Sequence, residues 1–133
     1  MTAQARRTGN YILVVEDEVD IQLALKEALE WQGYHVITAS NGNEALDTLS
    51  RVLLPCVILL DLMMPVMNGW EFSKTLRADE KLSTIPIVVV SAYTDRASEI
   101  GAQEAIGKPV NLNTLYSLVK KYCGGQSQAS CLG

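Results

Sequence analysis

The sequence predicts a doubly wound α/β domain with a five-stranded parallel sheet. Short apolar runs that end in polar residues alternate with helical patterns along the chain. The run 56–60 is apolar throughout, as expected of a strand covered by helices on both faces, and it ends at Asp61. In open α/β sheets the ligand site lies beyond the carboxyl ends of the strands, so Asp61 is placed where such a fold carries its chemistry. Taken alone, this segment also fits an Asp that only caps the following turn.

The expected elements follow one another in a regular order. Strands are expected at 11–15, 35–39, 56–60, 87–90 and 105–106. Helices are expected from about residue 19 to Gly33, from Asn41 onward, from about Trp70 to Arg77, and over 111–122. The first helix carries a core stripe at helical spacing, formed by Ile21, Ala24, Leu25, Ala28 and Leu29. We therefore expect one domain over 11–123, between a flexible N-terminal segment, 1–10, and a flexible tail, 124–133.

Composition and charge exclude several classes of protein. The net charge is −4, from 11 basic and 15 acidic side chains, and there is no basic cluster of the kind that binds nucleic acid. No apolar run is long enough for a membrane span, and residues 1–10 lack the apolar segment of a signal peptide. Three cysteines, an odd number without metal-ligand spacing, favour a reducing compartment. We therefore expect a cytoplasmic protein with no nucleic-acid or membrane partner.

Four expected strand ends carry polar side chains: Glu16 and Asp17, Asp61, Ser91, and Lys108. In a parallel sheet all four ends meet at one edge. Three carboxylates packed together repel one another, and Mg²⁺, a hard cation that prefers oxygen ligands, relieves that repulsion. A carboxylate is a usable nucleophile toward phosphorus once a metal ion and a lysine neutralise the phosphoryl oxygens. The pattern therefore predicts phosphoryl-transfer chemistry at this edge.

These residues, in this order, resemble the receiver domains of two-component response regulators, and the stand-alone chemotaxis-regulator-like members in particular. The resemblance rests on the motifs at 14–18, 61–65, 68–69, 91–92 and 108–109 and covers the chain from residue 11 to about residue 122. It implies the flavodoxin-like receiver fold, with strand order 2-1-3-4-5. It also implies that Lys108-Pro109 is a cis peptide.

The resemblance further implies a role for each site residue. Asp61 is the expected phosphorylation site, and Ser91 and Lys108 are expected to bind the phosphoryl group. Asp17 and Asp61 are expected to bind Mg²⁺ directly, with the Met63 backbone carbonyl, and Glu16 through water. The protein is then no conventional enzyme: it carries out only its own Mg²⁺-dependent phosphorylation and dephosphorylation.

The same resemblance indicates the partners. The phosphoryl donor is expected to be a phosphohistidine of a histidine kinase or histidine phosphotransfer protein, because His35, the one histidine of the chain, falls at the far end of the sheet. Val19 and Leu23 lie opposite the core stripe of the first helix and are the expected donor-docking residues. Because no effector domain follows in this sequence, we expect a stand-alone regulator that signals by binding a downstream target protein.

The sequence departs from the receiver pattern in two places. Receivers carry Tyr or Phe three residues before the lysine as a switch residue that acts with Ser91, and here that residue is Ala105. Ser91 and Lys108 are also closer in sequence than is usual, by more than one helical turn. The missing residues fall within 94–100, so the fourth helix is expected to be shortened. Both departures affect the usual output face.

Three other functions were weighed against this one. A flavin-binding domain would need a phosphate loop after the first strand, and the acidic residues 16–18 would repel a phosphate there. An Asp-nucleophile phosphatase would need a second Asp at position 63, which is Met63. The main alternative is a receiver-like scaffold that binds partners independently of phosphorylation.

Overall fold

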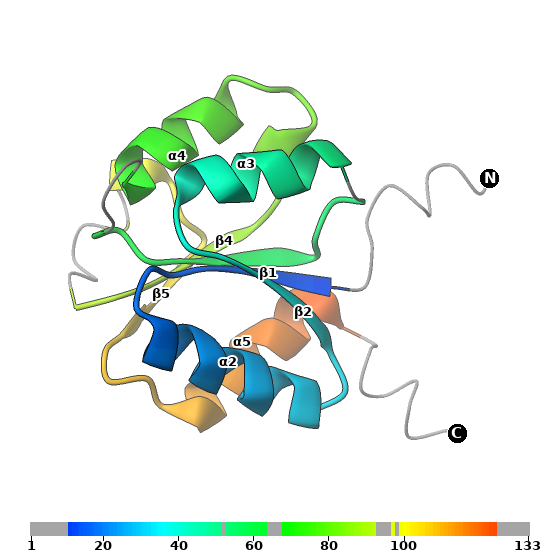
Figure 1. The fold of residues 1–133 in the computed structure, drawn as a ribbon, viewed down its shortest axis with the longest axis vertical. Coiled ribbons are helices and arrows are strands. Elements are labelled where there is room, and N and C mark those ends of the chain that lie inside the picture. Colours follow the sequence, from blue (N-terminus) through cyan, green and yellow to red (C-terminus); the bar gives the residue numbers. More distant parts are fainter. Residues whose placement is uncertain (1–10, 52, 64–67, 93–96, 98, 125–133) are drawn as a thin grey trace.

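A five-stranded parallel sheet in the order β2-β1-β3-β4-β5 forms the centre of the computed structural model. The structure describes residues 11–51, 53–63, 68–92, 97 and 99–124. Helices α3 and α4 cover one face of the sheet and helices α2 and α5 cover the other, which gives three layers (Figure 1). The expected doubly wound fold and its strand order are confirmed.

The strands and helices alternate along the chain. The strands are β1 (Tyr11–Val15), β2 (His35–Ala39), β3 (Val57–Leu60), β4 (Ile87–Ser91) and β5 (Glu104–Gly107). The α-helices are α2 (Val19–Trp31), α3 (Gly42–Arg51), α4 (Gly69–Arg77) and α5 (Leu112–Cys123), and one 3-10 helix, η1, covers Leu82–Thr84. None of the described helices is long and apolar enough to cross a membrane.

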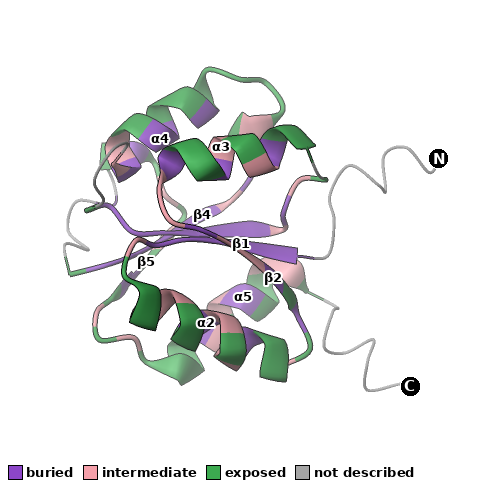
Figure 2. Ribbon diagram, in the orientation of Figure 1, coloured by how far each residue is buried: buried purple, intermediate pink, exposed green. Residues whose placement is uncertain are grey.

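The central strands are buried on both faces because apolar side chains occupy both sides of the pleat. Leu13, Ile58 and Val89 belong to the core beneath α3 and α4, and their chain neighbours belong to the core beneath α2 and α5. Every residue of β1, β3 and β4 is buried, and Figure 2 shows these strands as the buried layer between helices whose outer faces are exposed. The uninterrupted apolar runs of the sequence therefore became the centre of the sheet.

Fewer residues of α2 are buried than its sequence pattern predicts. Leu25 and Leu29 are buried, whereas Ala24, expected in the core stripe, is exposed. Ala24 lines a groove between α2 and the segment that leads from β5 into α5. The prediction for Ala24 was wrong because the margin of the stripe faces this groove rather than the sheet.

The connection from β4 to β5 has no α-helix among its described residues. Ala97, Glu99 and Ile100 have 3-10 geometry, and residues 93–96 and 98 lie outside the description. The side chains of Ala97 and Ile100 are buried in the same core as α4. Ala105, on the neighbouring edge strand β5, is exposed. The four α-helices thus follow β1, β2, β3 and β5, in agreement with the expected shortening of the fourth helix.

Two of the three cysteines are bonded to each other. Cys56, just before β3, forms a disulfide with Cys123, the last residue of α5, with the Cα atoms 5.3 Å apart. The sequence analysis took the odd cysteine count as a sign of a reducing compartment and did not foresee this pair. Cys131 lies outside the described residues.

The N-terminus of α4, the helix that follows Asp61 in the chain, packs closely against Leu62. Asn68 caps α4 by accepting a hydrogen bond from the Glu71 N–H at 2.9 Å, and the Glu71 side chain accepts one from the Asn68 N–H at 3.2 Å. Gly69 lies against the backbone of Leu62, so that a Cβ at position 69 would be 2.7 Å from the Leu62 Cα. Only glycine fits this approach, which fixes the chain directly after Asp61.

Gly69→Ala should therefore destabilise the domain, although alanine is the better helix former. Forcing a methyl group against backbone atoms costs about 1–3 kcal/mol, and thermal unfolding should show a melting temperature lower by about 4 °C or more. Lys74→Ala, at an exposed position of the same helix, is the control and should leave the melting temperature nearly unchanged. An unchanged melting temperature for Gly69→Ala would mean that the close approach is not required.

Candidate functional site

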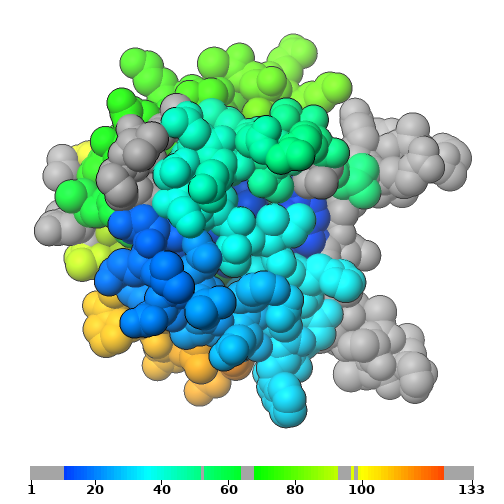
Figure 3. Space-filling view, viewed as in Figure 1, coloured from blue at the N-terminus to red at the C-terminus, as the bar shows by residue number. Residues whose placement is uncertain are grey.

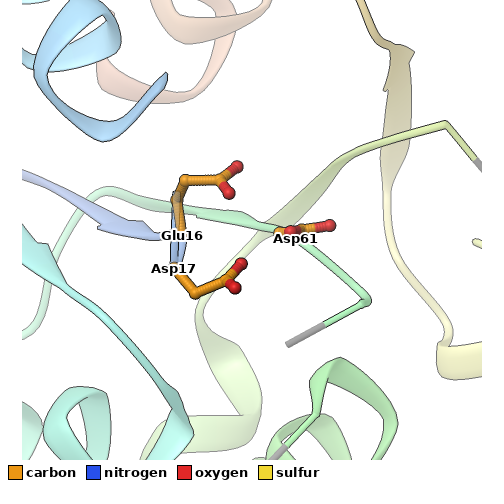
Figure 4. Close-up of side chains that lie close together, drawn as sticks. All are labelled: Glu16, Asp17 and Asp61. Atoms are coloured by element: carbon orange, nitrogen blue, oxygen red, sulfur yellow. The ribbon is translucent and has the colours of Figure 1, made fainter. Parts of the chain in front are cut away.

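Three carboxylates lie together at the carboxyl edge of the sheet. Glu16 and Asp17 follow β1, and Asp61 follows the adjacent strand β3, whose last residues pair with β1. One oxygen from each lies within 4.8 Å of the others, and Figure 4 shows the three side chains at the ends of these two strands. Glu16 and Asp61 are buried, and Asp17 is half-buried. The expected convergence of acidic strand ends is thus present in the structure.

Backbone hydrogen bonds hold the acidic turn in place. The Glu16 N–H donates to the Ala39 carbonyl at 3.0 Å, and the Asp61 N–H donates to the Val15 carbonyl at 3.0 Å, so both ladders continue one residue past the strands. The Gln22 side-chain amide donates to the Glu16 carbonyl at 2.8 Å. Gln22 was not singled out in the sequence. Its one distinguishing feature there is that it is a polar residue beside the core stripe of its helix.

Lys108 places the compensating charge among these carboxylates. Its Nζ lies 2.9 Å from Glu16 Oε1, 3.5 Å from Asp61 Oδ2 and 3.7 Å from Glu18 Oε1. The Lys108 side chain is only 17% exposed. The peptide bond to Pro109 is cis, as expected. Glu18, the third of these partners, is a contact that the sequence analysis did not assign.

Burial dominates the titration of the two buried acids. It raises the pKa of Glu16 and of Asp61 above the ordinary carboxyl values, and the nearby Lys108 offsets part of this shift. For Lys108 itself, burial acts to lower the pKa, but hydrogen bonding and the charges of Glu16 and Asp61 outweigh it, so the pKa is raised. The lysine therefore stays charged and the acids are held in an environment that disfavours their charge.

The Asp61 carboxylate has one anchored oxygen and one that faces the lysine. Oδ1 accepts a hydrogen bond from the Met63 N–H at 3.2 Å, and Oδ2 is the oxygen nearest Lys108. Ser91 ends β4 as a buried residue, and its carbonyl accepts a hydrogen bond from the Lys108 N–H at 3.3 Å. All the predicted strand-end residues are therefore at one edge, with a charged lysine opposite the Asp61 carboxylate.

The donor set fits a hard divalent cation. All three side chains offer carboxylate oxygen, the ligand that Mg²⁺ prefers, and no softer ligand belongs to the cluster as the structure describes it. Glu16 Oε1 is buried and lies 2.9 Å from the Lys108 ammonium, which is its partner in the described part of the chain. Three carboxylates share this one ammonium, and a bound cation would relieve the remaining excess of negative charge.

Comparison with known proteins identifies the family. The family model described as "Response regulator receiver domain" matches residues 12–120, most of the chain. The chain belongs to this family. Its members take part in two-component signal transduction, so the carboxyl-edge cluster is the acidic pocket of a receiver domain.

Individual receiver proteins agree with this identification. The polar-differentiation response regulator DivK of Brucella anthropi is 34% identical over 119 residues, which cover 85% of this chain and 95% of DivK. The structure of Vibrio cholerae CheY4, a chemotaxis protein, has 31% identity and a TM-score of 0.77, covering 84% of this chain and 97% of CheY4. The Thermotoga maritima response regulator TrrA, solved in complex with Mg(2+)-BeF, has 34% identity and a TM-score of 0.74, covering 86% and 99% of the two chains.

Removing the lysine tests the charge balance of this receiver pocket. Lys108→Met leaves Glu16 and Asp61 without their counter-charge, so the free energy of unfolding at pH 7.5 without metal should fall by about 2–3 kcal/mol. This is less than for a fully buried pair, because Lys108 is 17% exposed. The loss should shrink as the pH falls toward 5. Burial raises both carboxyl pKa values and Lys108 offsets part of that rise, so without Lys108 the folded variant takes up more protons in that window than the folded natural protein does. The variant therefore gains more stability on acidification than the natural protein.

Urea unfolding at the two pH values measures this effect. Lys121→Met is the matched control, because Lys121 pairs with Glu104 at the surface and its loss should change little at either pH. A Lys108→Met loss that is small, or equal at the two pH values, would contradict the charge balance described here.

Proposed function

We propose that this receiver domain accepts a phosphoryl group on Asp61 from a phosphohistidine of a histidine kinase or histidine phosphotransfer protein, in a Mg²⁺-dependent reaction. The observation that carries the proposal is the Asp61 carboxylate, which lies between an acidic pair and the Lys108 ammonium at the open edge of the sheet. A carboxylate so placed has both a metal-binding partner set and a cation for the incoming phosphoryl oxygens.

In the transfer, an Asp61 oxygen forms a bond to phosphorus while the bond between phosphorus and the donor imidazole nitrogen breaks, and the electron pair of that bond stays on the nitrogen. Lys108 and the Ser91 hydroxyl are the proposed partners of the phosphoryl oxygens. Bound Mg²⁺ would neutralise charge on the phosphoryl group and the carboxylates. The proposed ligands are the side chains of Asp17 and Asp61, the Met63 carbonyl, and Glu16 through water. The TrrA complex with Mg(2+)-BeF supports this assignment by relationship.

The donor must come from another protein. His35, the one histidine of the chain, is the first residue of β2 and so lies at the amino edge of the sheet, opposite the acidic cluster. No histidine of this chain can therefore pass a phosphoryl group to Asp61 of the same molecule. This geometry favours a partner that brings its own histidine to the carboxyl edge.

The N-terminal half of α2 is the proposed docking face for that partner. Val19 is 61% exposed and Leu23 48% exposed, one turn apart on the helix. The adjacent groove, about 420 Å³, is bordered by α2 residues and by the segment 108–112, in which Leu112 is also exposed. Figure 3 shows the surface of α2 in blue, on the side of the molecule that faces the viewer.

Lys108 connects this groove with the pocket, because it lines the groove and also contacts Asp61. An apolar helix face of the donor that covers Val19, Leu23 and the groove would therefore lie directly beside the phosphoacceptor.

The output is proposed to differ from that of a receiver with an aromatic switch residue. Ser91 remains as the phosphoryl-sensing residue, but its expected partner position is Ala105, whose side chain is exposed on β5 and has no ring to move. Because of this, the second candidate function is a scaffold that binds its partners independently of phosphorylation. Phosphate-dependent binding of a target protein would separate the two functions.

The remaining features of the protein are proposed on the same basis. The receiver domain is taken as residues 11–123, in a cytoplasmic protein whose output is the binding of a downstream protein. The ends that were expected to be flexible, 1–10 and 124–133, lie outside the described residues except for Gly124. Neither a nucleic acid nor a membrane is a proposed partner. Catalysis is confined to the protein's own phosphorylation and dephosphorylation.

Labelling with a small acyl-phosphate donor tests the acceptor. Intact-mass analysis should show one added phosphoryl group in the presence of Mg²⁺ and little or none after chelation. Asp61→Asn should abolish the labelling, because the amide is not a nucleophile. Asp79→Asn is the control. It removes an exposed carboxylate just after the end of α4, outside the acidic cluster, and should label as the natural protein does. Undiminished labelling of Asp61→Asn would refute the assignment.

Leu23→Glu tests the docking face. The rate of phosphoryl transfer from the cognate phospho-donor protein should fall roughly tenfold, as expected when a central apolar contact worth about 1.4 kcal/mol is lost. Labelling by the small-molecule donor should not change, because Leu23 is outside the pocket. Leu53→Glu is the matched control, since Leu53 is 45% exposed and precedes β3 at the opposite edge of the sheet. If both donors slow equally, Leu23 is structural, and if neither slows, α2 is not the docking face.

A further inference from the structure

The Cys56–Cys123 pair lies apart from the phosphoacceptor pocket. Cys56 precedes the amino end of β3, whereas Asp61 follows its carboxyl end. Cys123 ends α5, which covers the same face of the sheet as α2 (Figure 1). The bond joins residues 67 positions apart, so it closes a loop that contains β3, α4, β4, β5 and α5.

The last turn of α5 is also held by noncovalent contacts, because Tyr122 packs against the core beneath α2 and α5. The two buried side chains of the helix, Leu115 and Val119, both precede its last turn. Beyond them, Lys121 and Tyr122 contact Glu104 of β5 at 2.6 and 3.0 Å. The Lys121 side chain is 59% exposed, and an exposed ion pair of this kind contributes little to stability. The disulfide adds a covalent restraint to these contacts at the end of the helix.

The surroundings of Cys56 suit both redox states. Both cysteines are half-buried at the margin of the core beneath α2 and α5 rather than enclosed within it. The Cys56 Sγ lies 3.3 Å from the Tyr11 carbonyl oxygen. After reduction, a Cys56 thiol could donate a hydrogen bond to this oxygen, while the backbone bond from the Cys56 N–H to the same carbonyl, at 2.9 Å, holds the strand start in place.

We propose that Cys56 and Cys123 form a reversible oxidation site. A low-molecular-weight disulfide such as glutathione disulfide is the oxidant, and the Cys56–Cys123 bond that results tethers the end of α5 to the start of β3. In the first step the thiolate of one cysteine attacks the small disulfide, and a mixed disulfide forms as one glutathione thiolate leaves. The second cysteine thiolate then attacks the protein sulfur of the mixed disulfide, and the second glutathione thiolate leaves. Two protein thiols are oxidised, one glutathione disulfide is reduced to two thiols, and a reducing dithiol reverses the sequence.

The tether acts on the stability of α5 and does not depend on phosphorylation of Asp61. A cross-link over a loop of this length restricts the unfolded chain strongly, so the oxidised protein should melt roughly 10 °C above the reduced one. Amide exchange over 119–123 should also be slower in the oxidised protein, because the last turn of α5 cannot separate from β3.

The experiment uses the full chain after treatment with glutathione disulfide or with dithiothreitol. Free thiols are alkylated under denaturing conditions and the peptides are mapped by mass. The proposal expects one alkylated cysteine, Cys131, and a Cys56–Cys123 cross-linked peptide after oxidation, and three alkylated cysteines after reduction. A cross-link that involves Cys131, or full alkylation of Cys56 and Cys123 after oxidation, would overturn it.

Melting temperatures supply a second measurement. Cys123→Ser and Cys56→Ala should each remove the difference between oxidised and reduced protein, and Cys131→Ser, the matched control, should retain it. If Cys56→Ala does not fold, Cys123→Ser, at the end of a helix, and the peptide map of the natural chain still decide the outcome. An equal melting temperature of the oxidised and reduced natural chain would overturn the proposed restraint on α5.

Discussion

Three carboxylates repel one another at one edge of the sheet, and the Lys108 ammonium offsets part of their charge. Two unit charges about 4 Å apart interact by roughly 4 kcal/mol at the effective dielectric constant of such a site. The sheet brings Glu16 and Asp61 together because β1 and β3 are neighbours, and the cis peptide at Lys108 accompanies the return of the β5 end toward them. The pocket carries more negative than positive charge, which favours a bound metal cation.

The fold and the pocket could be predicted because each rests on a local pattern. The uninterrupted apolar run before Asp61 predicts a strand buried on both faces, and the polar residue at its end predicts the functional edge. Since all strands of a doubly wound sheet point the same way, residues as far apart as Asp17 and Lys108 could be placed together without any contact information. The resemblance to receivers supplied the expected roles, which stay predictions, and the family match confirms the family.

Other features depend on contacts that a single sequence does not reveal. Ala24 has the spacing of a core residue, but its exposure is decided by how α5 and its preceding loop sit beside α2. Gln22 reaches the Glu16 carbonyl only because α2 starts immediately after the acidic turn. The pairing of Cys56 with Cys123 requires knowing that the end of α5 lies against the start of β3. In each case the deciding partner is distant in the chain or belongs to the backbone.

The short connection between β4 and β5 affects the output face and leaves the residues of the pocket in place. The residues proposed for phosphoryl transfer lie at the carboxyl edge, whereas Ala105 is exposed and no α-helix covers it among the described residues. Chemistry and output can therefore vary independently in this fold, because the pocket is built by strand ends and the output face by what packs on the last two strands. A receiver of this kind would be read through surfaces other than an aromatic switch.

A calorimetric titration of the metal-free protein with Mg²⁺ tests directly whether the acidic cluster is a binding site for this cation. The charge excess of the pocket predicts a single Mg²⁺ site, whose affinity falls at least tenfold in Asp17→Asn because a charged ligand is lost from a hard-cation site. Glu27→Gln, which removes an exposed carboxylate from the middle of α2, should bind Mg²⁺ as the natural protein does. Equal affinity in the natural protein and in Asp17→Asn, or no binding to either, would contradict the account.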